Sequence, residues 1–225
     1  MAVVGYQEAY SQNGLNKFAF TIETETSGRS VNCYLRVRGK GDYVPYYRWI
    51  HTVTLTVAGS TVVNKTGRYP DADTDWWESS ITINGTNYRR AYTAAAYTYT
   101  FGDAGGTISI SGSYDVTGTS DYLPKKGTYT PSGSASMAAL TASFNLNILN
   151  PDGSEPYQTG EAGTVEQSIN GGSYTRVYNE GASSYTIGTT FNYRNFTPGA
   201  HRELSSVTGI SPSNTTGPWS LTLSS

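Results

Sequence analysis

The chain has few of the residues that build covalent cross-links or catalytic centres. It contains one cysteine, Cys33, and two histidines among 225 residues. A single cysteine excludes an internal disulfide, and its alternation with Val31 and Leu35 predicts a small core residue. No segment approaches the ~20 apolar residues of a membrane-spanning helix. The N-terminus also lacks the basic and apolar regions of a secretory signal, so we expect synthesis in a cytoplasm without export.

Charged residues are also sparse, at 14% of the chain, with a formal net charge of −2. Nucleic-acid binding needs a basic patch and anionic membranes attract polybasic segments, and the sequence shows neither. The two histidines stand without a nucleophile elbow or metal-ligand spacing. We therefore expect no enzyme activity, no cofactor, and neither nucleic acid nor membrane as a partner.

Aromatic and strand-forming residues are abundant instead. The chain has 19 Tyr, 6 Phe and 4 Trp, which argues against disorder. Apolar and polar side chains alternate in many short runs, such as 18–22, 31–37 and 53–57. Turn residues bound these runs, and Asn84-Gly85 predicts a hairpin whose two central residues have positive φ. This pattern predicts an all-β fold whose sheets have one apolar face and one solvated face of Thr, Ser and Arg.

A stretch rich in Gly, Pro and Ser marks a domain boundary near residues 130–141. The run 133–140 is the expected last strand of the first domain. A second alternating series begins at Phe144 and contains about seven strand-like runs, the number in an immunoglobulin-like sandwich. The sequence therefore predicts two tandem antiparallel β-sandwich domains, residues 1–140 and residues 141–225.

Two aromatic clusters are candidates for a binding site. Neighbouring side chains of an extended segment point to opposite faces, so some of these rings must lie at a surface or an interface. Such rings suit glycans and protein interfaces alike. Packing between the sandwich and its own loops, an oligomer contact and a glycan site all stay open. The residues are Tyr43, Tyr46, Tyr47 and Trp49 in one segment and Trp76 and Trp77 in the other.

Alternating carboxylates precede the second cluster. Asp71, Asp73 and Asp75 resemble the first half of a calcium loop, whose full motif needs Gly at position six and Glu at position twelve. Trp76 and Thr82 occupy those positions, so the full motif fails. A partial calcium site and a solvated loop are the two interpretations. A pair of acids flanking a sugar, as in glycoside hydrolases, would arise here only by accident.

Several segments rich in Tyr, Ser, Thr and Gly carry a resemblance to known families. In the first half they are 30–38, 52–59, 97–114 and 134–137. Through these segments the first half resembles a family of minor structural proteins of tailed phages, which are sandwiches of this composition. Through segments 168–177 and 193–199 the second half resembles a fibronectin type III or immunoglobulin-like appendage. The aromatic segment 40–50 and the Asp/Trp segment 70–78 depart from this pattern.

The resemblance implies a non-enzymatic virion protein, such as a capsid decoration, head fibre, neck, tail or baseplate component. Such a protein would dock on other virion proteins, form a homo-oligomer and project one β-sandwich from the particle. It would assemble in the cytoplasm of the bacterial host, where disulfides are rare. The alternative is a carbohydrate-binding adhesin that recognises host surface glycans, with Trp76 and Trp77 as its expected platform.

Overall fold

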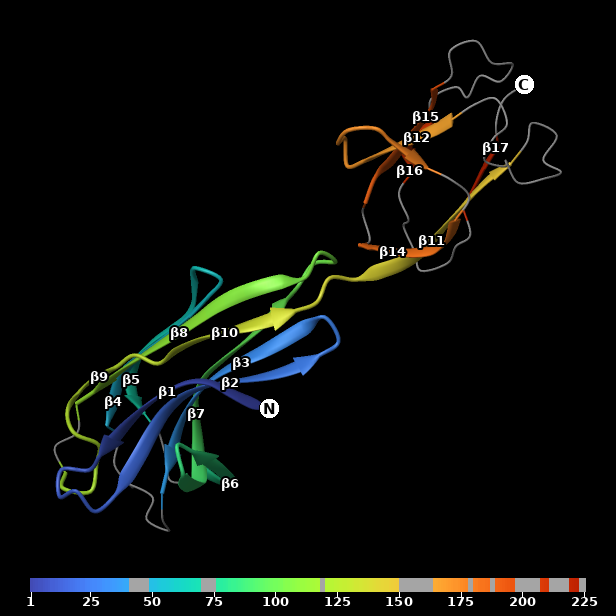
Figure 1. Cartoon of the computed structure of the whole chain (residues 1–225). Coiled ribbons are helices and arrows are strands. Elements are labelled where there is room, and N and C mark those ends of the chain that lie inside the picture. The colour runs from blue at the N-terminus through green and yellow to red at the C-terminus, as the bar shows by residue number, and fades with distance from the viewer. Residues whose placement is uncertain are drawn as a thin grey trace. The chain divides into compact units, whose positions relative to one another are not determined.

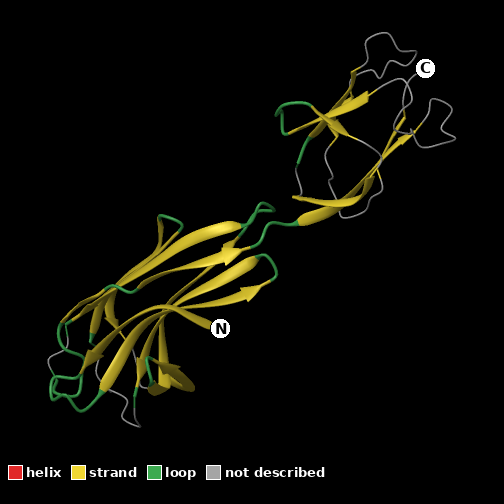
Figure 2. Ribbon diagram, viewed as in Figure 1, coloured by secondary structure: helices red, strands yellow, loops and turns green. Residues whose placement is uncertain are grey.

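The computed structural model shows an all-β protein (Figure 2), which confirms the fold class predicted from the sequence. No helix long and apolar enough to cross a membrane occurs in the part of the chain that is described. The chain splits into two compact units, Met1–Gly102 with Gly106–Met137, and Asp103–Gly105 with Ala138–Ser225. The described residues are 1–40, 49–69, 76–117, 120–149, 164–177, 180–186, 189–196, 207–210 and 219–222.

The first unit is a sandwich of two sheets (Figure 1). Its strands are β1 (Ala2–Tyr10), β2 (Lys17–Ser27), β3 (Ser30–Gly39), β4 (Ile50–Val57), β5 (Ser60–Tyr69), β6 (Trp76–Ile83), β7 (Thr86–Thr100), β8 (Gly106–Val116), β9 (Gly127–Tyr129) and β10 (Ser132–Met137). Sheet 1 has the order β1-β2-β3-β7-β6, and sheet 2 has the order β10-β8-β4-β5 with β9 paired to β8. All of these pairings are antiparallel.

The core between the two sheets holds the apolar side of the alternating runs. Phe20 on β2 lies in an aromatic group, with its ring centroid 5.0 Å from Tyr114 and 4.2 Å from the stacked ring of Tyr129. The ring of Trp49 stands edge-on to Phe20 at 6.1 Å. Cys33 is fully buried in the same core, as predicted, and burial raises the pKa of its thiol to about 11.

Tight turns set the register of the hairpins. Asn84 and Gly85 connect β6 to β7 with φ values of 46° and 73°, which confirms the predicted turn. Gly28, with φ of 58°, takes the same role between β2 and β3. The register that follows places Thr21 directly opposite Arg36. Polar residues far apart in the sequence therefore become neighbours on one face of sheet 1.

Two glycines allow an edge of sheet 1 to lie against an edge of sheet 2. A Cβ added at Gly5 on β1 would stand closer than 3.0 Å to the carbonyl oxygen of Ser132. A Cβ added at Gly133 on β10 would meet the carbonyl oxygen of Val4 at a similarly forbidden separation. Only glycine fits where two backbones approach this closely. The contact between β1 and β10 therefore depends on these two residues.

The second unit has seven described strands in two sheets. They are β11 (Thr141–Leu149), β12 (Thr164–Ile169), β13 (Thr175–Val177), β14 (Glu180–Thr186), β15 (Phe191–Phe196), β16 (Val207–Ile210) and β17 (Trp219–Thr222). The sheet orders are β14-β11-β17 and β13-β12-β15-β16. One pair differs from the antiparallel arrangement, because β11 and β17 run parallel. The rest of the unit lies between them in sequence, which supplies the long connection that a parallel pair needs.

Candidate functional site

The face of sheet 1 that points away from the core, here called the outer face, is only partly open. The alternation on β2 and β3 predicts a solvated face, and this prediction is wrong at Glu23 and Arg38, which are both 0% exposed. Ile83 and Tyr88, from the end of the β6–β7 hairpin, pack against Ala19 on the outer face of β2. The hairpin covers this region through contacts between distant strands, which local alternation does not reveal.

Polar contacts tie β1 and β2 to β7 across the outer face. The Tyr88 hydroxyl donates to Oε1 of Glu8 at 2.6 Å, and Nζ of Lys17 lies 2.9 Å from the same oxygen. Nζ of Lys17 also donates to the Thr86 hydroxyl at 3.0 Å. Since β2 and β3 separate β1 from β7 in the sheet, these contacts require the sheet to curl. The outer face is therefore concave at this end.

A buried ion cluster lies inside this curl. Glu23 accepts two hydrogen bonds from Arg38, Nε to Oε1 at 2.7 Å and Nη2 to Oε2 at 2.6 Å. Nη1 of Arg36 donates to Oε2 at 2.7 Å, and the Thr21 hydroxyl donates to Oε1 at 2.9 Å. Burial alone would raise the pKa of Glu23, but the hydrogen bonds and charge of Arg38, with the hydrogen bonds from Arg36 and Thr21, outweigh it and hold that pKa below its ordinary value. The carboxylate is therefore ionised at neutral pH.

An aromatic group forms where the ion cluster reaches the surface. The guanidinium of Arg36 lies 4.2 Å from the ring centroid of Tyr34 and 5.2 Å from that of Trp77. Its Nε donates to the hydroxyl of Thr93 at 3.1 Å. Arginine stacks well on aromatic faces because its guanidinium is planar and weakly hydrated. We call Tyr34, Arg36 and Trp77 the aromatic platform.

The two adjacent tryptophans separate as alternation predicts. Trp77 is 39% exposed on the outer face, whereas Trp76 is buried and packs against Tyr92 with ring centroids 5.9 Å apart. Trp49 is also buried, at 1% exposure, in the core. The prediction of a surface contact is therefore corrected for Trp49 and Trp76, and only Trp77 of the described candidates presents its ring to solvent. The candidates Tyr43, Tyr46, Tyr47, Asp71, Asp73 and Asp75 lie outside the described residues.

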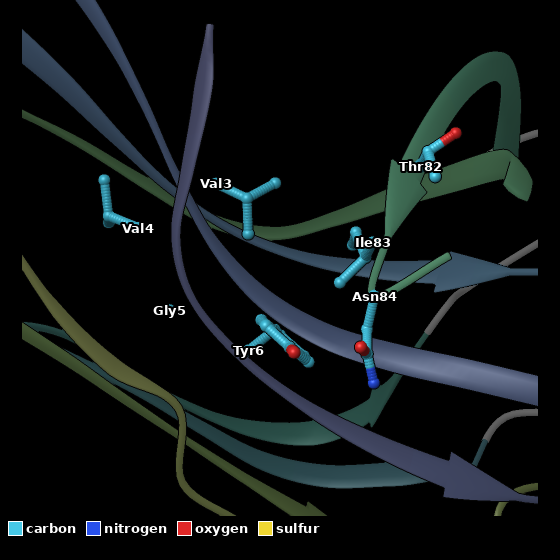
Figure 3. Close-up of a pocket in the computed structure, with 7 residues that line it drawn as sticks. All are labelled: Val3, Val4, Gly5, Tyr6, Thr82, Ile83 and Asn84. Atoms are coloured by element: carbon cyan, nitrogen blue, oxygen red, sulfur yellow. The ribbon is translucent and has the colours of Figure 1, made fainter. Parts of the chain in front are cut away.

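A pocket of about 370 Å³ opens between β1 and the turn that joins β6 to β7 (Figure 3). Val3 and Ile83 give it apolar surface, while Tyr6, Thr82 and Asn84 bring hydroxyl and amide groups. None of its lining residues carries a charge near neutral pH. The pocket is therefore suited to an uncharged group with both polar and apolar surface. Its lining also includes Val4 and Gly5.

No group of three or more His, Cys, Asp or Glu side chains with the arrangement of a metal site occurs among the residues that the structure describes. The carboxylates of Glu8 and Glu23 instead bind lysine and arginine side chains.

The sequence pattern did not predict that Glu23, Arg36 and Arg38 form one ion cluster. It treated the two arginines as part of a solvated strand face. The signal that reveals them is the turn at Gly28, because a two-residue turn there fixes the pairing of β2 with β3. That pairing places Glu23 opposite Tyr34 and diagonal to Arg36, while the long side chain of Arg38, which lies opposite Ala19, reaches the same carboxylate.

No protein-family model matches the chain, and no curated protein matches it. Among solved structures, the chain is similar to a bacterial adhesin from Mobiluncus mulieris that contains intramolecular disulfide, isopeptide and ester bond cross-links. The TM-score is 0.47 with 10% sequence identity, and the match covers 88% of this chain and 90% of that one. This likeness is too distant to assign a family or a function, so the case for function rests on the site itself.

Proposed function

We propose that this protein is a non-enzymatic adhesin that binds a cell-surface glycan on the outer face of sheet 1. The observation that supports the proposal is Trp77, a partly exposed ring on a partly covered, curled sheet face. Flat aromatic rings with one polar edge pack against the apolar faces of sugar rings and still leave sugar hydroxyls free to bond. The aromatic platform offers such a surface.

Contacts within the protein hold the platform side chains in place. Trp77 packs on Arg36, whose guanidinium is bound by the buried carboxylate of Glu23 and by the Thr93 hydroxyl. Immobilising a mobile side chain on binding costs about 0.5–1.5 kcal/mol. A ring already held in place avoids most of this cost, which matters for the weak contacts typical of single sugars.

Polar groups continue from the platform along β3 and β7. Asn32 lies opposite Thr98 in the strand pairing, and the Thr98 hydroxyl donates to Oδ1 of Asn32 at 2.7 Å. Tyr34 hydroxyl donates to Oε2 of Glu25 at 3.5 Å. These exposed donors and acceptors lie on the same face as Trp77. They give the directional hydrogen bonds that a glycan needs for orientation.

The virion structural role predicted from the sequence is a second proposal. An exposed tryptophan beside an arginine also suits a protein interface, because both residues are enriched in interface cores. In that case Trp77 would contact another virion protein or a second copy of this chain. The same variants separate the two proposals, since one predicts glycan binding and the other predicts assembly.

The experiment is direct binding of labelled protein to a panel of bacterial cells and purified surface polysaccharides. We expect saturable binding by the wild type, lost in Trp77→Ala and kept in Tyr97→Ala. Tyr97 is a matched control, since it is 38% exposed and lies on the opposite face of sheet 1, opposite Cys33 in the pairing. Glycan binding that survives in Trp77→Ala would overturn the proposed site. A folded wild type that binds no glycan but self-associates through Trp77 would favour the assembly role.

A further inference from the structure

A second pocket, of about 310 Å³, lies on the β6–β7 pair close to the platform in sequence. Arg89 and Arg90 from β7 and Ser79 and Ser80 from β6 line it, together with Glu78. Glu78 directly follows Trp77 along β6. The lining thus combines two arginines with two serines, residue types rich in hydrogen-bond donors, on the strand pair that also carries Trp77.

A break in the strand pairing shapes this pocket. The register between β6 and β7 shifts between Glu78 and Ile81, so Ser79 and Ser80 together oppose the single residue Arg89 on β7. Bulges of this kind re-aim side chains and are common beside binding sites. Nη1 of Arg38 fixes the bulge by donating to the carbonyl oxygen of Ser79 at 3.1 Å and to its hydroxyl at 2.9 Å.

The charge behind and around the pocket is positive. Arg38, which holds the bulge, is fully buried and belongs to a cluster in which two arginines share the single carboxylate of Glu23. Arg89 and Arg90 add two positive charges at the lining, and Glu78 is the only acid among the lining residues. The ion cluster and the pocket lining together contain four arginines and two glutamates, whereas the chain as a whole has a net charge of −2. The positive potential is local rather than a property of the whole protein.

We propose that this pocket binds a carboxylate or sulfate group of the glycan held by the aromatic platform, so that the ligand is an acidic polysaccharide. The inference rests on the proposed function and names its ligand class. Guanidinium groups bind carboxylate and sulfate oxygens through paired, charge-assisted hydrogen bonds, and serine hydroxyls add further donors. Glu78 lies opposite Arg90 in the strand pairing, and its negative charge offsets one of the two positive charges of the lining. The charge that remains favours a ligand with a single acidic group.

A nucleic acid is the less favoured polyanion. Binding a phosphate backbone uses an extended basic stripe that neutralises many phosphates. The positive groups here are confined to one pocket, and the chain as a whole is acidic. The local arrangement therefore matches one acidic substituent presented beside a sugar ring.

The first experiment tests the pocket without any glycan. Sodium sulfate and sodium acetate are titrated into labelled protein at constant ionic strength, and NMR follows the Nε–H groups of Arg89 and Arg90 and the amides of Ser79 and Ser80. We expect saturable shifts confined to these groups, lost in the Arg89→Gln/Arg90→Gln double variant. The Lys125→Gln/Lys126→Gln variant, which removes two exposed charges elsewhere in the first unit, should keep them. Shifts that never saturate, or that spread over all basic residues, would overturn the proposal.

The second experiment uses an acidic polysaccharide found in the binding panel and the same polymer after carboxyl reduction or desulfation. We expect the charge-removed polymer and the double arginine variant each to weaken binding by about tenfold, and no further loss when the two are combined. Equal binding of the charged and charge-removed polymers would overturn the acidic ligand. If Trp77→Ala still abolishes binding in that case, the proposal of glycan binding is retained and only the acidic nature of the ligand is rejected. Single-stranded DNA that binds as tightly as the acidic polymer would also contradict the inference.

Discussion

Arg38 and Glu23 form a two-bond ion pair in which neither side chain is exposed, with N–O distances of 2.6 and 2.7 Å. Removing one partner of a buried pair is far more harmful than the net value of the pair, because the other charge stays buried and uncompensated. Here one carboxylate serves two arginines. Removing Glu23 would therefore leave both arginines without their shared carboxylate.

Glu23→Gln should lower the free energy of unfolding by about 3–5 kcal/mol, because it leaves two arginines without a counter-ion. Chemical denaturation at neutral pH measures this. Glu25→Gln is the matched control, since Glu25 is exposed two residues further along the same strand. The control should change stability by about 0.5 kcal/mol or less. Equal losses of unfolding free energy in the two variants would show that the buried ion cluster contributes no more to stability than an exposed glutamate does.

The same pair predicts how stability depends on pH. The pKa of Glu23 is lower in the folded protein than in the unfolded chain, so the folded state binds the proton less readily. Its contribution is present in full above the unfolded pKa of about 4.3 and is lost as the pH falls through the lowered folded value. Denaturation curves collected from pH 7 to pH 3 should therefore show a steeper loss of stability for wild type than for Glu23→Gln. Parallel pH profiles would contradict this assignment.

Several parts of the fold follow from local sequence rules. The strands follow from alternation, the Asn84-Gly85 turn from its residue types, and the separation of Trp76 from Trp77 from the two-residue period of a strand. These features depend on neighbours in sequence. The same rules place Cys33 in the core.

The burial of Glu23 could not be predicted in this way. It accompanies contacts of the outer face with the β6–β7 hairpin, more than fifty residues away, where Tyr88 packs against Ala19 and Ser79 accepts a hydrogen bond from Arg38. The platform has the same origin, since Arg36 on β3 and Trp77 on β6 meet only after β7 is inserted between their strands. Alternation shows which residues share a face, but not what covers that face.

The hydrogen bond from Tyr88 to Glu8 should stabilise the curl of sheet 1. Burial and the neighbouring carboxylate raise the pKa of Tyr88, so its hydroxyl stays protonated as a donor. Tyr88→Phe should cost about 1.5–3 kcal/mol, the range for hydrogen bonds to charged groups. Tyr10→Phe is the control, because that side chain is exposed. Thermal unfolding of both variants is the measurement, and an unchanged Tyr88→Phe would show that the curl does not need this bond.

The glycines at the contact between β1 and β10 should be intolerant of any side chain. Gly5→Ala and Gly133→Ala each force a methyl group into a neighbouring backbone and should each cost about 1–3 kcal/mol. Gly102→Ala is the control, because a Cβ there meets nothing within 4 Å. Denaturant midpoints compare the three variants. If all three behave alike, the two edges lie further apart than the structure shows.

The most direct test of the account is to locate the glycan on the protein. The indole N–H of Trp77 gives an NMR signal distinct from those of Trp49 and Trp76, which are buried. Titration with a polysaccharide from the binding panel should shift the Trp77 signal and the Arg36 Nε–H signal, while the two buried indoles stay in place. A ligand that binds without moving the Trp77 and Arg36 signals would contradict the proposed recognition by the outer face of sheet 1.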